Sequence, residues 1–174
     1  MSFTFRSSVL TLGIALLTAT AAQAQAPTAR DAIPEKMPNH ILYGAPISLE
    51  RADGVLTAAI NESKARGWAM NCAVYDSGAN LVTFKRQDGA QLGSIDISHH
   101  KARTAVKYRR STLALENGVQ EGGNIYLLTL DDVIASRGGN MLLEGGKIIG
   151  AIGCSGGTGS QDDVVSKAGV AALK

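Results

Sequence analysis

Two pairs of short β-prone segments, each closed by a tight polar turn, constrain the fold of this chain most strongly. In the first pair, an Asp-Ser-Gly turn joins apolar residues 70–75 to residues 80–85, which alternate and place Val82 and Phe84 on one expected face. In the second pair, a Glu-Gly-Gly-Lys turn joins residues 140–143 to residues 148–152. Because hairpins build antiparallel sheets, we predict an α+β fold rather than a doubly wound parallel sheet.

Helices are predicted before, between and after these hairpins. Apolar residues recur at helical spacing over residues 48–66 and again over residues 95–109, where Ser94 is the expected N-cap. The stretch 111–123 is expected to be a short helix or a loop. Residues 125–130 fit either a strand or a single helical turn, and the pattern does not decide between them.

A final helix is expected after the glycine-rich segment 153–159. Ser160 and Asp163 have the spacing of a capping-box pair. The apolar stripe of this helix is predicted to consist of Val164, Ala168 and Ala171.

The first 24 residues read as a secretory signal peptide. Arg6 provides the positive start, residues 9–22 are apolar, and Ala22-Gln23-Ala24 and Ala24-Gln25-Ala26 both fit a cleavage site. The apolar stretch falls short of the roughly 20 residues that a membrane-spanning helix needs, which disfavours an uncleaved anchor. We therefore expect a periplasmic or secreted protein without stable membrane insertion.

The mature chain is expected to contain a proline-rich arm, residues 25–47, and one domain, residues 48–174. All four prolines lie in the arm, which lacks a helical or alternating period. Cleavage would remove one of 17 basic residues against 15 acidic ones, so the mature chain is nearly neutral. Neutral charge and few aromatic residues argue against nucleic-acid binding.

Cys72 and Cys154 are the two cysteines, in a compartment expected to permit oxidation. A disulfide is left open, but two cysteines specify no framework. The favoured interpretation is that both fill small buried positions on strands and remain reduced or pair only partially.

The glycine-rich segment suggests two chemistries, and both are disfavoured. Gly153-Cys154-Ser155-Gly156-Gly157 matches the GxSxG nucleophile motif, but no histidine follows the serine, as the α/β-hydrolase order requires. The start of the last helix could hold an anion, yet Asp162 and Asp163 would repel it. The glycines are better explained by a tight connection between strand and helix.

The histidines are the sharpest candidates for a ligand site. His99 shares the apolar stripe of its helix with Ala102, whereas His100 lies on the polar face near Asp96, and the third histidine, His40, lies in the arm. Adjacent residues on a helix point about 100° apart, so His99 and His100 cannot ligate one ion together. A histidine in such a place is most often a core or interface residue whose ring nitrogens are hydrogen-bonded. An apolar slot with one histidine also suits a haem iron.

The candidate cofactor-binding set combines the histidines with cations and a hydroxyl around the second predicted helix. His99 is the expected axial ligand, His40 is a rival that could reach a neighbouring subunit, and the cations would face the haem propionates. The complete set is His99, His100, His40, Lys101, Arg103, Arg109, Arg110 and Thr112.

Several ordered motifs between residues 48 and 174 resemble the GlcG/HbpS-like haem-binding (haem-degrading) family, which includes the C-terminal domain of PduO-type proteins. The matching stretches are AVYDSGANLV (73–82), FKRQDGA (84–90), SIDI (94–97), KARTA (101–105), GG (145–146), IGAIGCSGG (149–157) and QDD (161–163). The resemblance implies a five-stranded antiparallel sheet flanked by helices, a homo-oligomer, and haem or a related tetrapyrrole as ligand.

The chain also departs from the family pattern. A turn that commonly reads Gly-Gly-His is Gly78-Ala79-Asn80 here, so any role of that histidine is lost. Glu50 and Asp53 are only a partial echo of an acidic iron-binding pair. Both departures bear on the site and leave the implied fold unchanged.

Two functions follow as hypotheses. The first is an exported haem-binding protein for haem capture, buffering or redox sensing. No residue indicates that the protein is a dedicated enzyme. Haem degradation would therefore be at most slow and coupled to added ascorbate or peroxide. The alternative is a small-molecule enzyme or accessory protein of a catabolic operon, using a pocket between the Lys101 helix and the glycine-rich loop.

Overall fold

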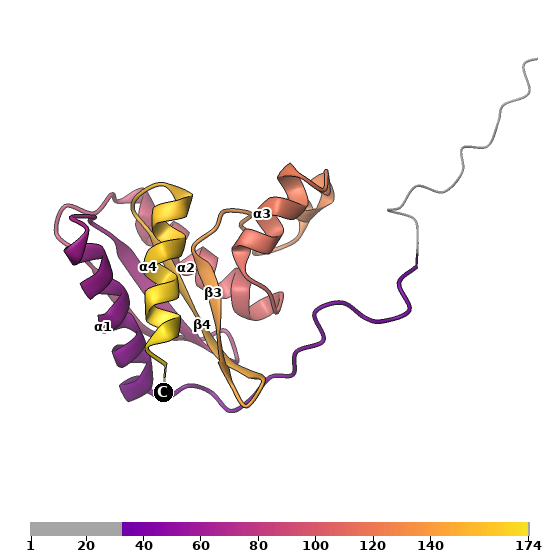
Figure 1. The fold of residues 1–174 in the computed structure, drawn as a ribbon, viewed down its shortest axis with the longest axis horizontal. Helices are drawn as coiled ribbons and strands as arrows, with labels where there is room; N and C mark the ends of the chain where they lie inside the picture. The colour runs from indigo at the N-terminus through magenta and orange to yellow at the C-terminus, as the bar shows by residue number, and fades with distance from the viewer. Residues whose placement is uncertain (1–32, 174) are drawn as a thin grey trace, which may run out of the picture. The chain divides into compact units, whose positions relative to one another are not determined.

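The computed structural model describes residues 33–173, and the domain lies in the compact unit that begins at Met37. The predicted signal peptide lies outside the described residues. The helices are α1 (Leu49–Ala65), α2 (Gly93–Lys107), α3 (Thr112–Gln120), the 3-10 helix η1 (Ile125–Thr129) and α4 (Gly159–Ala171). The strands are β1 (Asn71–Asp76), β2 (Leu81–Arg86), β3 (Gly139–Glu144) and β4 (Lys147–Ser155) (Figure 1). Within residues 33–173, none of the helices has the length and apolar character to cross a membrane.

The sheet has four strands in the order β2-β1-β4-β3, and every neighbouring pair is antiparallel. Both predicted hairpins and the α+β class are confirmed, but the expected fifth strand is wrong. Residues 33–47, the described part of the arm, make one isolated parallel bridge, between Tyr43 and Ile148. The arm cannot extend a ladder there, because Pro46 has no N–H to donate.

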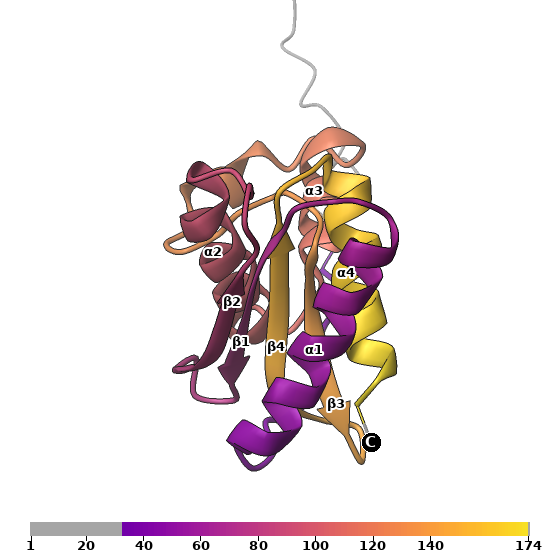
Figure 2. The ribbon, with the colours of Figure 1, turned by 90° about the vertical axis from the view of Figure 1, so that its left-hand side faces the viewer.

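Helices cover the two faces of the sheet unequally. Figure 2 shows α1 and α4 packed beside one another on one face and α2 on the other. The larger apolar core lies under α1 and α4 and includes Leu56, Val74 and Ile152. Because α2 contacts mainly β4 and β1, the outer strand β2 is less covered on the α2 face.

A β-bulge in the first hairpin decides which face Phe84 occupies. Val74 pairs with Thr83 and Tyr75 pairs with Leu81, so Val82 has no partner. Val82 consequently packs against the core under α1, whereas Phe84 packs on the α2 side. The prediction that these two side chains share a face is wrong, because the extra residue resets the alternation.

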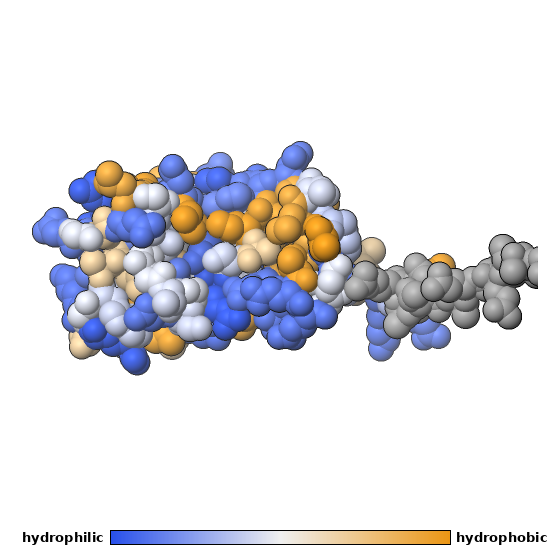
Figure 3. Space-filling model, turned by 90° about the horizontal axis from the view of Figure 1, so that it is seen from above, coloured by the Kyte–Doolittle hydropathy of each residue, from blue (hydrophilic) through white to orange (hydrophobic). Residues whose placement is uncertain are grey.

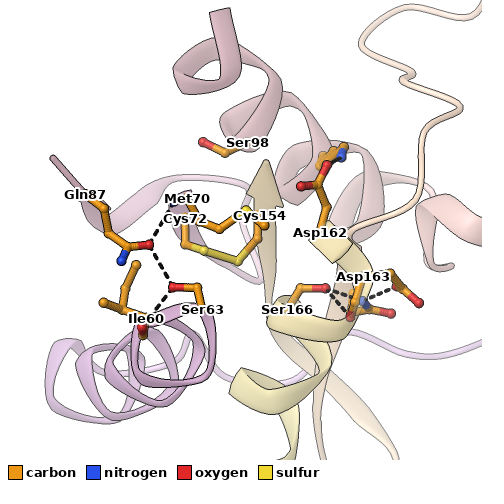
Figure 4. Close-up of a disulfide and its surroundings, with 12 residues drawn as sticks. Ile60, Ser63, Met70, Cys72, Gln87, Ser98, Cys154, Asp162, Asp163 and Ser166 are labelled. Carbon is orange, nitrogen blue, oxygen red and sulfur yellow. Dashed lines mark hydrogen bonds and ion pairs between the residues drawn. A yellow bond between two sulfur atoms is a disulfide. The ribbon is translucent and has the colours of Figure 1, made fainter. Parts of the chain in front are cut away.

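Cys72 and Cys154 form a disulfide, which corrects the expectation that they stay reduced. Their positions were predicted well, since both lie on strands and neither is exposed. They are register partners on the central strands β1 and β4, with Cα atoms 4.2 Å apart (Figure 4). This pairing joins residues 82 positions apart, so only the strand order could reveal it.

Two local predictions differ from the structure at helix ends. Leu92, without a side-chain cap bond, precedes α2, and Ser94 lies buried inside the helix. The α4 capping box is made by Thr158 and Gln161 rather than Ser160 and Asp163. A Gln at this position can reach back to the capping backbone N–H, which favours the Thr-x-x-Gln pair.

The face that α4 buries is unexpectedly polar. Val164 is 38% exposed, so the predicted apolar stripe does not face the core. The buried side chains include Asp162, Asp163 and Ser166. Asn140 of β3 donates hydrogen bonds to Asp163 and to Ser166, which satisfies this polar interface. The segment 125–130, left open by its sequence, forms the 3-10 helix η1.

Candidate functional site

The predicted site residues separate into an interior group and a surface group, although most of them follow one another on and after α2. Lys101 belongs to the interior. Its Nζ donates to Asp162 Oδ2 at 2.7 Å, and only 1% of the Lys101 side chain and 4% of that of Asp162 are exposed. Asp162 also accepts from the N–H of Gly157. Lys101 therefore fixes α2 to the start of α4 and is not available to a ligand at the surface.

Thr112 also proves to be structural. It is fully buried, and its Oγ1 accepts a hydrogen bond from the N–H of Gly139 at 2.9 Å. A Cβ at Gly139 would meet Thr112 Cγ2 at 2.7 Å, so the backbone of Gly139 packs directly against the Thr112 side chain. The contact positions β3 against the start of α3 and leaves Thr112 no surface for a cofactor.

His99 lies at the surface of α2, beside the two aromatic side chains that the first hairpin turns toward this helix. Its ring stacks on Phe84 with centroids 4.7 Å apart and meets the edge of Tyr75 at 5.8 Å. The hydroxyl of Tyr75 lies 3.0 Å from His99 Nδ1. The other ring nitrogen, Nε2, has no hydrogen-bond partner within residues 33–173. One nitrogen of His99 is thus held in place while the other is free.

Arg103 extends this arrangement to the loop after η1. Its Nη1 donates to the Tyr75 hydroxyl at 3.4 Å, and its Nε and Nη2 contact Asp132 at 3.0 to 3.1 Å. Lys107 reaches the same carboxylate at 2.6 Å. Asp132 is in turn fixed because its carbonyl accepts from Thr104 Oγ1. We call His99, Tyr75, Phe84, Arg103 and Asp132 the His99 cluster.

Charge and burial set the protonation of this cluster. Burial lowers the pKa of His99 below its usual value, and the Arg103 cation lowers it further. Burial alone would raise the pKa of Asp132, but hydrogen bonds from Arg103 and Lys107 outweigh it and the pKa is lowered. At neutral pH the cluster therefore holds a neutral imidazole beside a paired Arg and Asp.

His100 is placed differently from His99. Its Nε2 is buried, lies 3.3 Å from Asp132 Oδ1 and does not form a hydrogen bond of normal geometry. This nitrogen is therefore not accessible at the surface, although 33% of the His100 side chain is exposed. The carboxylate beside His100 is that of Asp132, whereas the sequence had suggested Asp96.

The remaining candidates do not join the cluster. Arg109 stacks over Tyr43 at 5.6 Å and Arg110 donates to the carbonyl of Tyr108. His40 is exposed on the arm. Neither arginine pairs with a carboxylate within residues 33–173.

The pocket that the enzyme alternative required, between α2 and the glycine-rich loop, is closed at Gly153. A Cβ at Gly153 would overlap the carbonyl oxygen of Ser98 and the amide of Ala102. The start of α4 is also occupied by its own side chains, because Gln161 and Thr158 cap one another. The glycines thus permit close packing, as their structural interpretation predicted.

Sequence reasoning missed Tyr75, Phe84 and Asp132. The hairpin alternation could have placed Tyr75 and Phe84 on one face had the bulge been known. No local pattern marks Asp132, which reaches α2 from a loop and has a positive φ of 58°. Among residues 33–173, no group of three or more His, Cys, Asp or Glu side chains could hold a metal ion by itself.

Comparison with known proteins identifies the family. The family model described as haem degrading protein HbpS-like matches residues 47–171. The chain belongs to the HbpS-like family. Protein GlcG of Escherichia coli strain K12 is 35% identical over 109 residues, which cover 63% of this chain and 81% of GlcG.

Solved structures of this family agree with the fold. The crystal structure of HbpS matches with a TM-score of 0.71 and 25% identity, over 80% of this chain and 98% of that one. The crystal structure of a PduOC:heme complex matches with a TM-score of 0.68 and 25% identity, over 75% of this chain and 96% of that one. Both likenesses span nearly the whole of the compared protein.

The His99 cluster fits the group that this family implies. Haem iron accepts an imidazole nitrogen, and a ligating histidine normally uses its second nitrogen in a hydrogen bond to a fixed neighbour. His99 meets both conditions through Nε2 and through the Nδ1 contact with Tyr75. Phe84 supplies an apolar surface beside it.

Proposed function

We propose that this chain is an exported haem-binding protein in which His99 Nε2 is the axial ligand. The observation that carries the proposal is the His99 cluster, in which a neutral, oriented imidazole stands against an aromatic surface. When bound, haem would supply an iron centre whose coordination position the imidazole fills. Tyr75 would hold the ring orientation, and Arg103 would keep Tyr75 in place.

A haemin titration of the purified protein tests this proposal. We expect a saturable Soret band for the wild type, its shift or loss in His99→Ala, and a nearly unchanged band in His100→Ala. The pair is matched, since both variants remove an imidazole from the same turn of α2. An unchanged spectrum in His99→Ala with a lost one in His40→Ala would transfer the site to the arm.

Capture, buffering or redox sensing are the roles that we propose for such binding. Degradation of haem requires a reductant and oxygen at the iron. No residue of the cluster indicates that the protein catalyses this degradation. We therefore expect at most slow loss of the Soret band, and only with added ascorbate or peroxide. If the Soret band disappeared at the same rate without ascorbate or peroxide, this expectation would be contradicted.

We also propose that the protein is a homo-oligomer, with η1 at an interface between copies. Ile125, Tyr126, Leu128 and Leu130 are 68%, 62%, 56% and 36% exposed. Figure 3 shows an apolar cluster on the face above α3 and η1. Exposed apolar side chains gathered in this way mark interaction surfaces. Light scattering should give a multiple of the chain mass, and Ile125→Glu with Leu128→Glu should reduce it.

Export after cleavage of residues 1–24 completes the proposal. It is supported by the three-part pattern of the N-terminus. Mass spectrometry of the protein from a periplasmic extract should show a chain that begins at Gln25 or Pro27. An intact Met1 would overturn it.

A further inference from the structure

A groove at the outer edge of β2 collects cations that form no ion pair with a carboxylate of residues 33–173. Its volume is about 610 Å³, and it is lined in part by Lys64, Phe84, Lys85, Arg86, Gln87 and Asp88. This volume lies within the range of about 300 to 1,000 Å³ that is typical of small-molecule sites. The groove lies at the edge strand, away from the Lys101 pair.

The charge of the groove differs from that of α2. On α2, Lys101, Arg103 and Lys107 are each within ion-pair distance of a carboxylate. In the groove, Lys64 and Arg86 form no ion pair with any described residue, and Lys85 donates only to the hydroxyl of a threonine on α1, at 2.9 Å. Three cations thus face one acidic side chain of the lining, that of Asp88. An anion in the groove would relieve this imbalance.

Gln87 adds an oriented donor that has no partner. Its Oε1 accepts from Ser63 Oγ at 2.7 Å and from the N–H of Met70 at 2.8 Å. These two bonds fix the amide, and Figure 4 shows its nitrogen turned away from both donors. Within residues 33–173, Nε2 of Gln87 donates to no acceptor. The groove therefore combines cations that lack ion pairs among the described residues with a fixed N–H donor, a combination that favours an oxyanion.

We propose that this groove binds the carboxylate or phosphate group of a small ligand. Two sources share this chemistry. One is a free small anion. The other is a propionate of the tetrapyrrole, since Phe84 both lines the groove and stacks on His99. Only the second source rests on the proposed function, so the two can be tested separately.

The first experiment titrates the protein with sodium phosphate and, separately, with succinate at low ionic strength, followed by NMR. Saturable shifts are expected at residues 85–88. Gln87→Glu keeps an acceptor for Ser63 and Met70 but replaces the free N–H donor with an oxygen, so it should weaken binding about tenfold. Lys64→Gln should act in the same direction. Lys147→Gln, which replaces an exposed cation at the start of β4, should change the affinity less than twofold.

The second experiment titrates the same variants with haemin. Weaker haemin binding in Gln87→Glu and Lys64→Gln, with no response to phosphate or succinate, assigns the groove to propionates. Binding of the small anions with unchanged haemin affinity assigns it to a free anion. Wild-type affinity of both variants for all three probes overturns the groove proposal. Absence of a Soret band in the wild type overturns the haem proposal alone, and Lys64→Gln keeps the test valid should Gln87→Glu fail to fold.

Discussion

Lys101 and Arg103 lie two residues apart on α2 and have opposite surroundings. Lys101 is almost completely buried and, among residues 33–173, pairs only with Asp162, whereas the Arg103 side chain is 32% exposed and bridges Tyr75 and Asp132. A buried cation without its partner is costly, while a partly exposed one can be solvated. Position on α2 thus separates the residues that maintain the fold from those available to a ligand.

The largest effect is expected when the interior pair is broken. Lys101→Met leaves the Asp162 carboxylate buried without its cation, which should lower the free energy of unfolding by about 4 kcal/mol. Urea unfolding measures the loss. As the surface control, Lys107→Met removes a cation that is 46% exposed and should cost less than about 1 kcal/mol. Equal losses in the two variants would break the distinction between interior and surface.

Removal of the disulfide tests whether the interior can be weakened without altering the His99 cluster at the surface. Replacing both Cys72 and Cys154 by Ala removes a link between residues 82 positions apart. We expect a loss of about 3 kcal/mol in unfolding free energy, because the unfolded chain becomes less constrained. The haemin spectrum should stay unchanged. Thiol counting of the denatured wild type should find no free cysteine, and two free thiols would contradict the bond.

A smaller effect is expected at the surface, where Tyr75→Phe removes the hydroxyl between His99 and Arg103. Unfolding free energy should fall by about 1 kcal/mol. Haemin affinity should fall about tenfold, because the ligating ring loses its fixed neighbour. Tyr108→Phe is the matched control, since it deletes a hydroxyl that donates to the carbonyl of Asp131 at 2.5 Å. Its haemin affinity should not change.

The smallest effect concerns pH. The pKa of His99 is lower in the folded state than in the unfolded chain, so the unfolded state binds more protons between the two values. Stability should therefore fall as the pH drops below about 6.5, the pKa of a free histidine, and level off below the folded pKa. Thermal melts at pH 7.5 and 5.5 measure this. The decrease should be smaller in His99→Gln, and an identical decrease would exclude His99 as its source.

Predictions from sequence succeeded where the signal was local. Turn residues and alternation fixed the place of both hairpins, and helical spacing located α1, α2 and α4 to within a few residues. Two predictions failed where contacts between distant segments changed the local pattern. The bulge at Val82 moved Phe84 to the α2 side, and the polar contacts of Asn140 allowed α4 to bury Asp163 in place of an apolar stripe.

By itself, the sequence determined both hairpins, the helices α1, α2 and α4, the antiparallel class and the family, because periodicity, turn chemistry and ordered motifs are properties of neighbouring residues. It also singled out His99 by its place on a helix. Tertiary structure alone decided that Cys72 meets Cys154, that Lys101 is buried on Asp162, and that Tyr75 and Phe84 surround His99. These contacts join segments 15 to 82 residues apart, and such pairs depend on strand order and helix packing, which no local pattern specifies.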